Sequence, residues 1–336
     1  MSRFQPTILV ASVLLAVLSS SAQAHHSAAA FNTQTKITIT GTVAEYSFRN
    51  PHVYMVVNVK KEDGSTSAVE VEAGAGSVIA PLGFTRDSLK VGEKVSVIGN
   101  PAKSGDKVFL GLELYKEDGT YLPLNINSTA ATKASDAKAT SIAGTWFSPN
   151  QSFFGFLGGQ RNWPVTAAGK AAIEKSASLP TPQKDCQPIG EPALMLYPVA
   201  TVIEVQKDRV LMHVDWLDSE RVIWTDGRKH PAATETFPHG HSVGQFEGTT
   251  LVVDSTNFAP NPIGFSMSLP SGKGKHLVEK FALSPDGKGM VYSGTMEDPE
   301  FLSAAVQWTG NWQYRPDMKH SNEKCDIATA QKFLKY

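Results

Sequence analysis

Two histidines near the start of the sequence have the chemistry to bind a metal ion. His25 and His26 follow Ala24 directly, and cleavage there would leave a free α-amine beside two imidazoles. Nitrogen ligands of this kind suit Cu(II) or Ni(II), which favour square-planar coordination. His52 would supply a further imidazole if the terminus folds back onto it. The sequence therefore predicts His25, His26 and His52 as a candidate copper site, against the alternative of a frayed terminus and a separate structural histidine.

A second group of ionisable side chains lies in a long connection, residues 226–248. Long connections in compact domains often carry function. His239 and His241 would point to the same side if they lie on a strand, which is a geometry that metal ligands use. We expect Arg228 and His230 to contact a ligand and His241 to take part in chemistry. Histidines that only order the loop by hydrogen bonds are the alternative.

A third group depends on which face of one predicted strand points inward. In residues 209–217, apolar side chains alternate with His213 and Asp215. If the apolar set packs against outer elements, His213 and Asp215 enter the interior of a barrel, which at about eight strands can hold one small ligand. An exposed polar face is the alternative. The predicted acid–base group comprises His213, Asp215, His241 and Glu279. The predicted ligand contacts are Arg221, Arg228, His230, Asp254 and Trp308.

The elements that would position the first group belong to a small β-domain, residues 25–125. Runs rich in β-branched residues predict strands at 36–48, 53–60, 68–72, 94–98 and 107–115. Gly41 predicts a bend or bulge in the first strand. A segment around Pro81 predicts a short helix after the third strand. Five strands with a helix in that place are typical of an OB-type barrel.

Residues 127–141 lack large apolar side chains, and residues 126–141 are predicted to form a flexible linker. Residues 142–336 predict a larger antiparallel β-barrel or sandwich with a few short helices, because short turns between strands disfavour parallel pairing. Its predicted strands are 199–206, 209–217, 221–225, 242–246, 249–257, 276–284, 289–296 and 305–314. A helix is expected at 166–175 with Thr166 as its N-cap, and another at 323–334. The aromatic and glycine-rich run 153–159 is interpreted as a core-packing loop or the wall of a pocket.

The first 24 residues have the three parts of a cleaved secretory signal. Arg3 gives a positive start, Ile8–Leu18 is apolar, and Ala22-Gln23-Ala24 is a small-x-small cleavage pattern. The apolar run is too short to span a bilayer core of roughly 30 Å. We therefore expect a periplasmic or secreted protein without a membrane span. The formal net charge of −1 and the lack of basic blocks argue against nucleic acid as a partner.

The sequence has two cysteines, Cys186 and Cys325. An exported protein matures where disulfides persist, so we expect these two to pair. Two unrelated buried thiols are the alternative.

Several short motifs resemble an uncharacterised family of bacterial periplasmic proteins over roughly residues 25–125: His25-His26-Ser27, Gly41-Thr42-Val43, Asn50-Pro51-His52 and Leu89-x-Val91-Gly92-Glu93-x-Val95. The segments 240–244 and 247–254 are similar to a second uncharacterised β-rich module that sometimes follows the first. The resemblance implies export and a two-module layout, and it implies no activity.

The leading prediction is an exported protein whose second domain binds a small, mostly apolar molecule. If it is an enzyme, it transforms that molecule by acid–base chemistry of the lyase or isomerase type, without an organic cofactor. A periplasmic copper-binding protein and a non-catalytic envelope adaptor are the alternatives. The sequence contains no nucleophile elbow, phosphate-binding loop, dinucleotide fingerprint or His-Glu-x-x-His helix that would choose among them, and it leaves the oligomeric state open.

Overall fold

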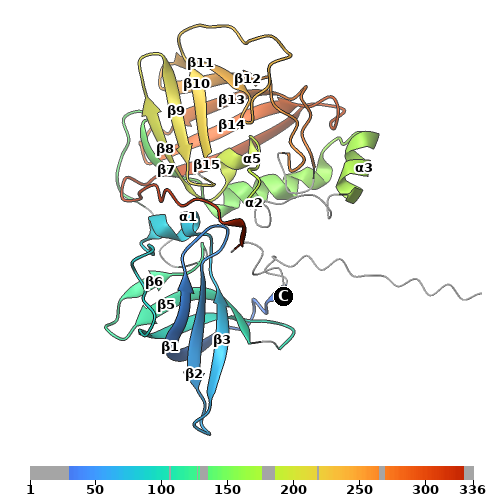
Figure 1. Ribbon diagram of the computed structural model, residues 1–336. Coiled ribbons are helices and arrows are strands. Elements are labelled where there is room, and N and C mark those ends of the chain that lie inside the picture. The colour runs from blue at the N-terminus through green and yellow to red at the C-terminus, as the bar shows by residue number, and fades with distance from the viewer. Residues whose placement is uncertain are drawn as a thin grey trace, which may run out of the picture.

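The computed structural model describes residues 30–328, except residues 106, 127, 129–134, 176–185, 218 and 265–268. Two β-barrels lie one above the other, and the C-terminal segment, residues 315–328, passes between them (Figure 1). His25, His26, the predicted signal sequence and the second half of the helix predicted at 323–334 lie outside the described residues. The described first half begins as extended chain, with Cys325 bridged to Asn50, so the helix prediction is wrong for residues 323–326.

The first barrel has the predicted five-stranded OB arrangement. Its strands are β1 (Ile37–Ser47), β2 (Tyr54–Lys60), β3 (Thr66–Glu72), β4 (Lys94–Pro101) and β5 (Val108–Lys116), with β6 (Tyr121–Pro123) added at the edge of β5. The sheet closes where β3 pairs with β5 in parallel. The predicted helix after the third strand is α1 (Gly76–Ile79), continued by the 3₁₀ turn η2 (Ala80–Leu82).

Gly41 lies where β1 bends across β2. A Cβ atom at this position would lie 2.3 Å from the backbone oxygen of Asn58, so only glycine allows the two strands to approach this closely. The pairing register of β1 and β2 shifts two residues further on, between Val43 and Glu45. The predicted bend is therefore a close strand crossing followed by a β-bulge, which helps a short sheet to close.

The second barrel is closed by nine strands. They are β7 (Gly144–Phe147), β8 (Ala200–Val205), β9 (Arg209–Val214), β10 (Ser219–Trp224), β11 (His241–Glu247), β12 (Thr250–Thr256), β13 (His276–Leu283), β14 (Gly289–Glu297) and β15 (Val306–Tyr314). The helices beside it are α2 (Asn150–Gly159), η3 (Gln160–Asn162), α3 (Ala167–Lys175) and α5 (Ala193–Leu196). The prediction of a mainly β fold is confirmed. Thr166 is the N-cap of α3, as predicted, and its hydroxyl accepts a hydrogen bond from the Gly169 N–H at 3.1 Å.

Three details of this barrel differ from expectation. The four-residue strand β7 was not predicted, because it is too short to show a periodic pattern. The run 153–159 is part of helix α2, whose buried side chains include Phe153 and Phe156. β10 and β11 pair in parallel, whereas all other neighbours in the barrel are antiparallel. A parallel pair needs a long crossover, and the connection 225–240 provides it.

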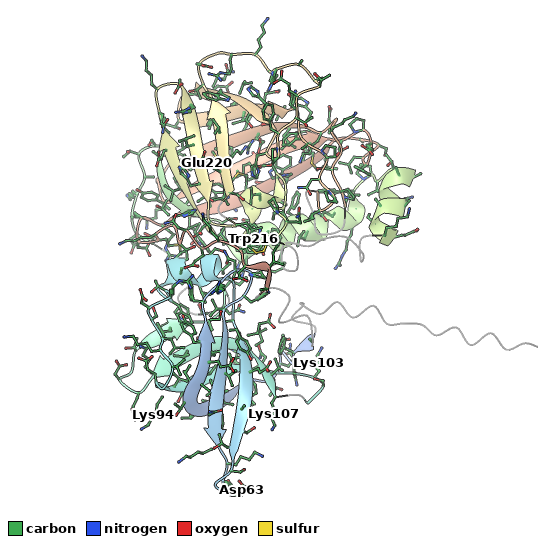
Figure 2. All side chains as sticks on the ribbon, in the orientation of Figure 1. Asp63, Lys94, Lys103, Lys107, Trp216 and Glu220 are labelled. Carbon is green, nitrogen blue, oxygen red and sulfur yellow. A yellow bond between two sulfur atoms is a disulfide. The ribbon has the colours of Figure 1, made fainter. Side chains whose placement is uncertain are left out.

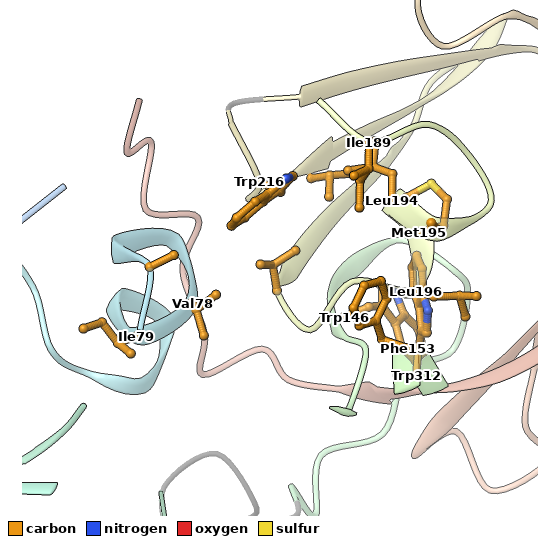
Figure 3. Close-up of a cluster of buried hydrophobic side chains, with 14 of the residues drawn as sticks. Val78, Ile79, Trp146, Phe153, Ile189, Leu194, Met195, Leu196, Trp216 and Trp312 are labelled. Carbon is orange, nitrogen blue, oxygen red and sulfur yellow. The ribbon is translucent and has the colours of Figure 1, made fainter. Parts of the chain in front are cut away.

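The inside of the second barrel is densely filled with apolar side chains. Val210, Met212 and Val214 of β9 point inward and are fully buried, and aromatic rings from β13, β14 and β15 pack beside them. Phe281 stacks on Tyr292, with ring centroids 4.7 Å apart. One hydrophobic cluster contains residues of both barrels, and it includes Val78 and Ile79 of α1. Val78 lies on the side of α1 that faces Trp216 (Figure 3). Trp216 lies at the junction of the two barrels (Figure 2).

Asn50 joins the C-terminal segment to the first barrel. Its side chain is fully buried, accepts hydrogen bonds from the N–H and hydroxyl of Ser77 at 3.1 Å each, and donates to the Glu323 carbonyl at 2.6 Å. Its own carbonyl accepts the Asp326 N–H at 3.1 Å. The predicted disulfide between Cys186 and Cys325 is present and fixes the same segment to the second barrel.

Two ion pairs reinforce this joint: Arg49 with Asp326, and Arg86 with Glu323 at 2.6 Å. The two arginines are about half exposed, so each pair adds little by itself. The buried amide of Asn50 therefore dominates the polar contacts of the joint. Over the described residues, no helix is long and apolar enough to cross a membrane.

Replacing Asn50 by alanine should lower the free energy of unfolding by about 2–3 kcal/mol, because it leaves buried groups of Ser77 and Glu323 without their partner. Urea denaturation measures this change. Asn58→Ala, at an exposed position of β2, is the control and should change stability by less than about 0.5 kcal/mol. Equal effects of the two substitutions would show that Asn50 does not hold the joint.

Candidate active site at the mouth of the second barrel

A buried ion pair lies inside the second barrel. Arg221 on β10 donates from Nη1 to Oε1 of Glu279 on β13 at 3.0 Å, and its Nη2 pairs with Oε2. Tyr292 on β14 donates its hydroxyl proton to Oε1 at 2.7 Å. The hydroxyls of Ser242 and Ser255 accept from Arg221 Nη2 at 3.2 and 3.0 Å. Five neighbouring strands thus each supply one inward-pointing polar group, and burial of a charged pair is tolerated because its hydrogen bonds are largely satisfied.

A second group of charges lies nearby, at the end of the barrel where β11 and β13 begin. Glu191, just before α5, is fully buried, and its Oε1 accepts a hydrogen bond from His239 Nδ1 at 2.9 Å. Lys275 immediately precedes β13 and is 2% exposed. Its Nζ donates to the backbone oxygen of Glu191 at 3.0 Å and lies 4.1 Å from the centre of the Phe258 ring. We call Glu191, His239 and Lys275 the mouth cluster.

The charges of the mouth cluster shift one another's pKa values. Burial would raise the pKa of Glu191, but the His239 charge and hydrogen bond, together with Arg221 and Lys275, outweigh it and lower the pKa to about 2. Burial lowers the pKa of Lys275 to about 8, against the opposing effect of Glu191. Burial also opposes the charge on His239, but the Glu191 carboxylate prevails and raises the pKa of His239 above 6.5. Shifts of this kind are frequent at catalytic sites.

Several buried polar atoms around the mouth cluster have no hydrogen-bond partner among the described residues. They are Oε2 of Glu191, Oγ of Ser271, Oδ1 of Asp298 and Nε of Arg221. Leaving such an atom unpaired costs about 1–3 kcal/mol, so a water molecule, an ion or a ligand group at this place would remove a real penalty. Asp298 follows the end of β14, and burial raises its pKa despite the N–H that Gly272 donates to it.

The Glu191–His239 pair has the geometry of a general acid–base dyad. The carboxylate accepts from Nδ1 and so holds the imidazole in one tautomer and orientation, which leaves Nε2 on the opposite edge of the ring to exchange a proton. The His239 side chain is 20% exposed, whereas Glu191 is fully buried. Lys275 adds a neighbouring cation close to its titration point, which can polarise an oxygen atom of a substrate.

The predicted acid–base residues His213, Asp215, His241 and Glu279 do not come together in the structure. His213 does not enter the interior: it points outward, with Nδ1 3.3 Å from Glu220 and Nε2 3.8 Å from Glu204. The prediction chose the wrong face of β9, because the apolar residues that alternate with His213 fill the inside of the barrel and do not pack against outer elements. Glu220 lies on the second barrel in Figure 2.

Asp215 is buried, as predicted, but it does not face the interior of the barrel. Its carboxylate accepts hydrogen bonds from the N–H and hydroxyl of Ser321 at 2.7 and 2.6 Å and so holds the C-terminal segment. Burial raises its pKa to about 6, although His320 and the hydrogen bonds from Ser321 act in the opposite direction. Glu279 is the one predicted acid–base residue that lies inside.

His241 belongs to a chain of hydrogen bonds on the outer wall. Its Nδ1 lies 2.9 Å from Nδ1 of His230, whose Nε2 donates to Asp254 Oδ1 at 2.9 Å. His276, which was not predicted, donates to the other oxygen of Asp254 at 3.0 Å. The structure thus brings together three predicted residues, but on the surface of β11 and β12 that faces away from the barrel interior. Arg228 lies apart from them, paired with Asp226 and stacked 3.4 Å over the Trp224 ring.

The remaining predictions concern metal ligands and one aromatic contact. Nδ1 of His52 lies 3.1 Å from the Ala73 carbonyl oxygen and 3.2 Å from Glu72 Oε1, and these contacts orient the ring. Within the described part of the chain, no three or more His, Cys, Asp or Glu side chains are arranged to hold a metal ion. A copper site that includes His25 and His26 stays a prediction. Trp308 on β15 is buried and lines a groove against α2.

Sequence reasoning missed Glu191 and Lys275 and considered His239 only as a possible metal ligand beside His241. The structure separates these two histidines, because His239 binds Glu191 and His241 contacts His230 on the outer wall. All three members of the mouth cluster precede a strand or helix rather than lie within one, so no alternation pattern marks them. Glycine neighbours were the available signal: Gly190 precedes Glu191, Gly274 precedes Lys275 and Gly240 follows His239. A glycine beside a charged residue often marks a place where backbone and ligand come close.

Residues 12–112 match a family of unknown function (DUF6152). The match covers most of the first barrel and under a third of the chain, so the second barrel and its mouth cluster lie outside it. It supports the resemblance to an uncharacterised family, while the individual motifs and the second module stay predictions. No curated protein was found to match the sequence.

The pKa of Lys275 predicts a pH-dependent stability. The unfolded chain keeps this lysine protonated up to about pH 10.5, whereas the folded protein releases the proton near pH 8. Between these two pH values the unfolded state binds more protons than the folded state. The contribution of Lys275 to the free energy of unfolding should therefore rise with pH, by about 3 kcal/mol in all. Urea denaturation at intervals from pH 7.5 to 10.5 should show the rise in the wild type and not in Lys275→Met. Lys280→Met, at an exposed position of β13, should retain it; identical slopes in all three proteins would contradict the expectation.

Proposed function

We propose that this chain is an exported protein that binds a small, mostly apolar molecule at the mouth of its second barrel and transforms it by acid–base chemistry. The chemistry is of the lyase or isomerase type, with proton transfer at a carbon atom next to an activating group. The observation that carries the proposal is the fully buried Glu191 carboxylate, 2.9 Å from Nδ1 of a partly exposed histidine.

Each member of the mouth cluster has a separate role in this proposal. His239 takes a proton from the substrate through Nε2 and returns it at another position. Glu191 stays ionised, orients the imidazole and stabilises the imidazolium that forms. Lys275 donates a hydrogen bond to the substrate oxygen on which negative charge develops. These steps need no redox partner, because the proton that leaves the substrate is carried by His239.

A purely structural role explains this cluster less well. Buried charges are expensive, and their replacement by apolar residues of similar size is often neutral or stabilising. The Arg221–Glu279 pair has an almost complete set of hydrogen bonds and is adequately explained as a structural element. Among the described residues, one oxygen atom of Glu191 and one of neighbouring Asp298 find no hydrogen-bond partner, as is expected of a site that completes its bonds with a ligand.

Deuterium exchange of a simple ketone tests the acid–base function without knowledge of the natural substrate. 1-Indanone has exchangeable protons next to its carbonyl, and their loss in D₂O can be followed by proton NMR. The wild-type protein should accelerate exchange about a hundredfold over buffer. The rate should rise as pH passes through the raised pKa of His239, because only the neutral imidazole accepts a proton.

Two variants test whether the exchange activity depends on His239. His239→Ala should reduce exchange to the buffer rate, and added imidazole should restore part of it, since the side chain it replaces is partly exposed. His276→Gln, in the outer hydrogen-bond chain, should leave the rate unchanged. The proposal is wrong if the wild type gives only the buffer rate with this ketone, or if His239→Ala keeps full activity.

A further inference from the structure

A groove of about 510 Å³ runs between α2 and β15 on the second barrel, and its walls are largely aromatic. Phe156 and Trp163 form one side, with ring centroids 5.2 Å apart and planes at 73°. Trp308 lines the other side. This volume is within the range of sites for small organic molecules.

Two glycines on α2 keep the groove open. A Cβ atom at Gly155 would meet no atom within 4 Å, and one at Gly159 would meet only Nε1 of Trp163, at 4.0 Å. Glycine inside a helix costs about 1 kcal/mol relative to alanine. Larger residues at Gly155 and Gly159, which line the groove, would extend into it.

The polar atoms of the groove indicate what the ligand carries. Gln307 and Thr309 are exposed on β15 and line its rim. The indole N–H of Trp308 is buried and finds no acceptor among the described residues. The donors that a ligand oxygen can reach from the groove are therefore the Gln307 amide and the Thr309 hydroxyl.

The groove lies at the same end of the barrel as the mouth cluster. Gln307 pairs with Thr295 of β14, close to the end of that strand at Glu297, and Asp298 follows. The Trp308 ring lies 5.8 Å from that of Tyr292, whose hydroxyl binds Glu279. Trp308 thus stands between the groove and the buried charges.

The geometry points to this groove as the binding site for a flat, largely apolar ring compound with one oxygen acceptor, such as an aryl alcohol or an aryl ketone. Flat rings pack well against indole and phenyl faces, and the oxygen atom would accept from the Gln307 amide or the Thr309 hydroxyl at the rim. None of the residues that line the groove belongs to the mouth cluster, so this assignment is a second site and goes beyond the function proposed for the barrel mouth.

Binding of 2-naphthol tests the assignment without any reaction, since binding is measured directly by isothermal titration calorimetry. Gly155→Leu should weaken binding at least about tenfold, because the new side chain occupies the groove. Gly158→Leu is the matched control: it lies on the same helix, its added Cβ also meets no atom within 4 Å, and it does not line the groove. It should leave affinity unchanged. The melting temperatures of both variants verify that the fold is intact.

The saturated analogue 2-decalinol has the same carbon count but is not flat, and it should bind at least about tenfold more weakly than 2-naphthol. Absence of saturable 2-naphthol binding to the wild type, or equal weakening by the two glycine substitutions, would overturn the assignment. His239→Ala should bind 2-naphthol normally. Normal binding together with absent ketone exchange would therefore reject the acid–base function alone, and exchange without groove binding would reject the groove alone.

Discussion

The ion pair between Arg221 and Glu279 limits how the second barrel can be built. Its charges have almost no contact with water, so other strands must supply polar groups at inward positions. The serine hydroxyls on β11 and β12 and the Tyr292 hydroxyl on β14 do so. A slip of one residue in any of these strands would turn its polar group outward and leave a buried charge unpaired. The pair therefore fixes the register on which the mouth cluster depends.

The parallel pairing of β10 with β11 links this register to the candidate site. It requires the crossover 225–240, and that crossover carries histidines to both sides of the wall. His230 reaches Asp254 on the outer face, and His239 reaches Glu191 at the mouth. A tight antiparallel turn between β10 and β11 would leave no backbone to place a histidine over Glu191. The one irregularity of the barrel thus supplies its candidate acid–base group.

Alternation of apolar and polar residues located the strands, since their buried sides are mostly apolar, but it could not decide which side faces the interior. For β9 the two choices place either His213 or Met212 inside, and the choice depends on neighbours far away in the sequence. The residues of the mouth cluster were harder to predict than the strands. Glu191 and Lys275 lie outside the strands, and their proximity follows only from closure of the barrel. Cys186 and Cys325 could be paired from the sequence because only one pairing exists.

The joint between the barrels shows why the first barrel cannot be understood alone. Asn50 lies within the segment that matches the family of unknown function, yet its side-chain amide donates to Glu323, and its carbonyl accepts from Asp326, both near the far end of the chain. Cys325, between these two, is covalently attached to Cys186, five residues before Glu191. Asp215 holds Ser321 of the same segment from the end of β9. The connection that carries Glu191 is therefore joined to the first barrel through the Cys186–Cys325 disulfide and the hydrogen bonds of Asn50.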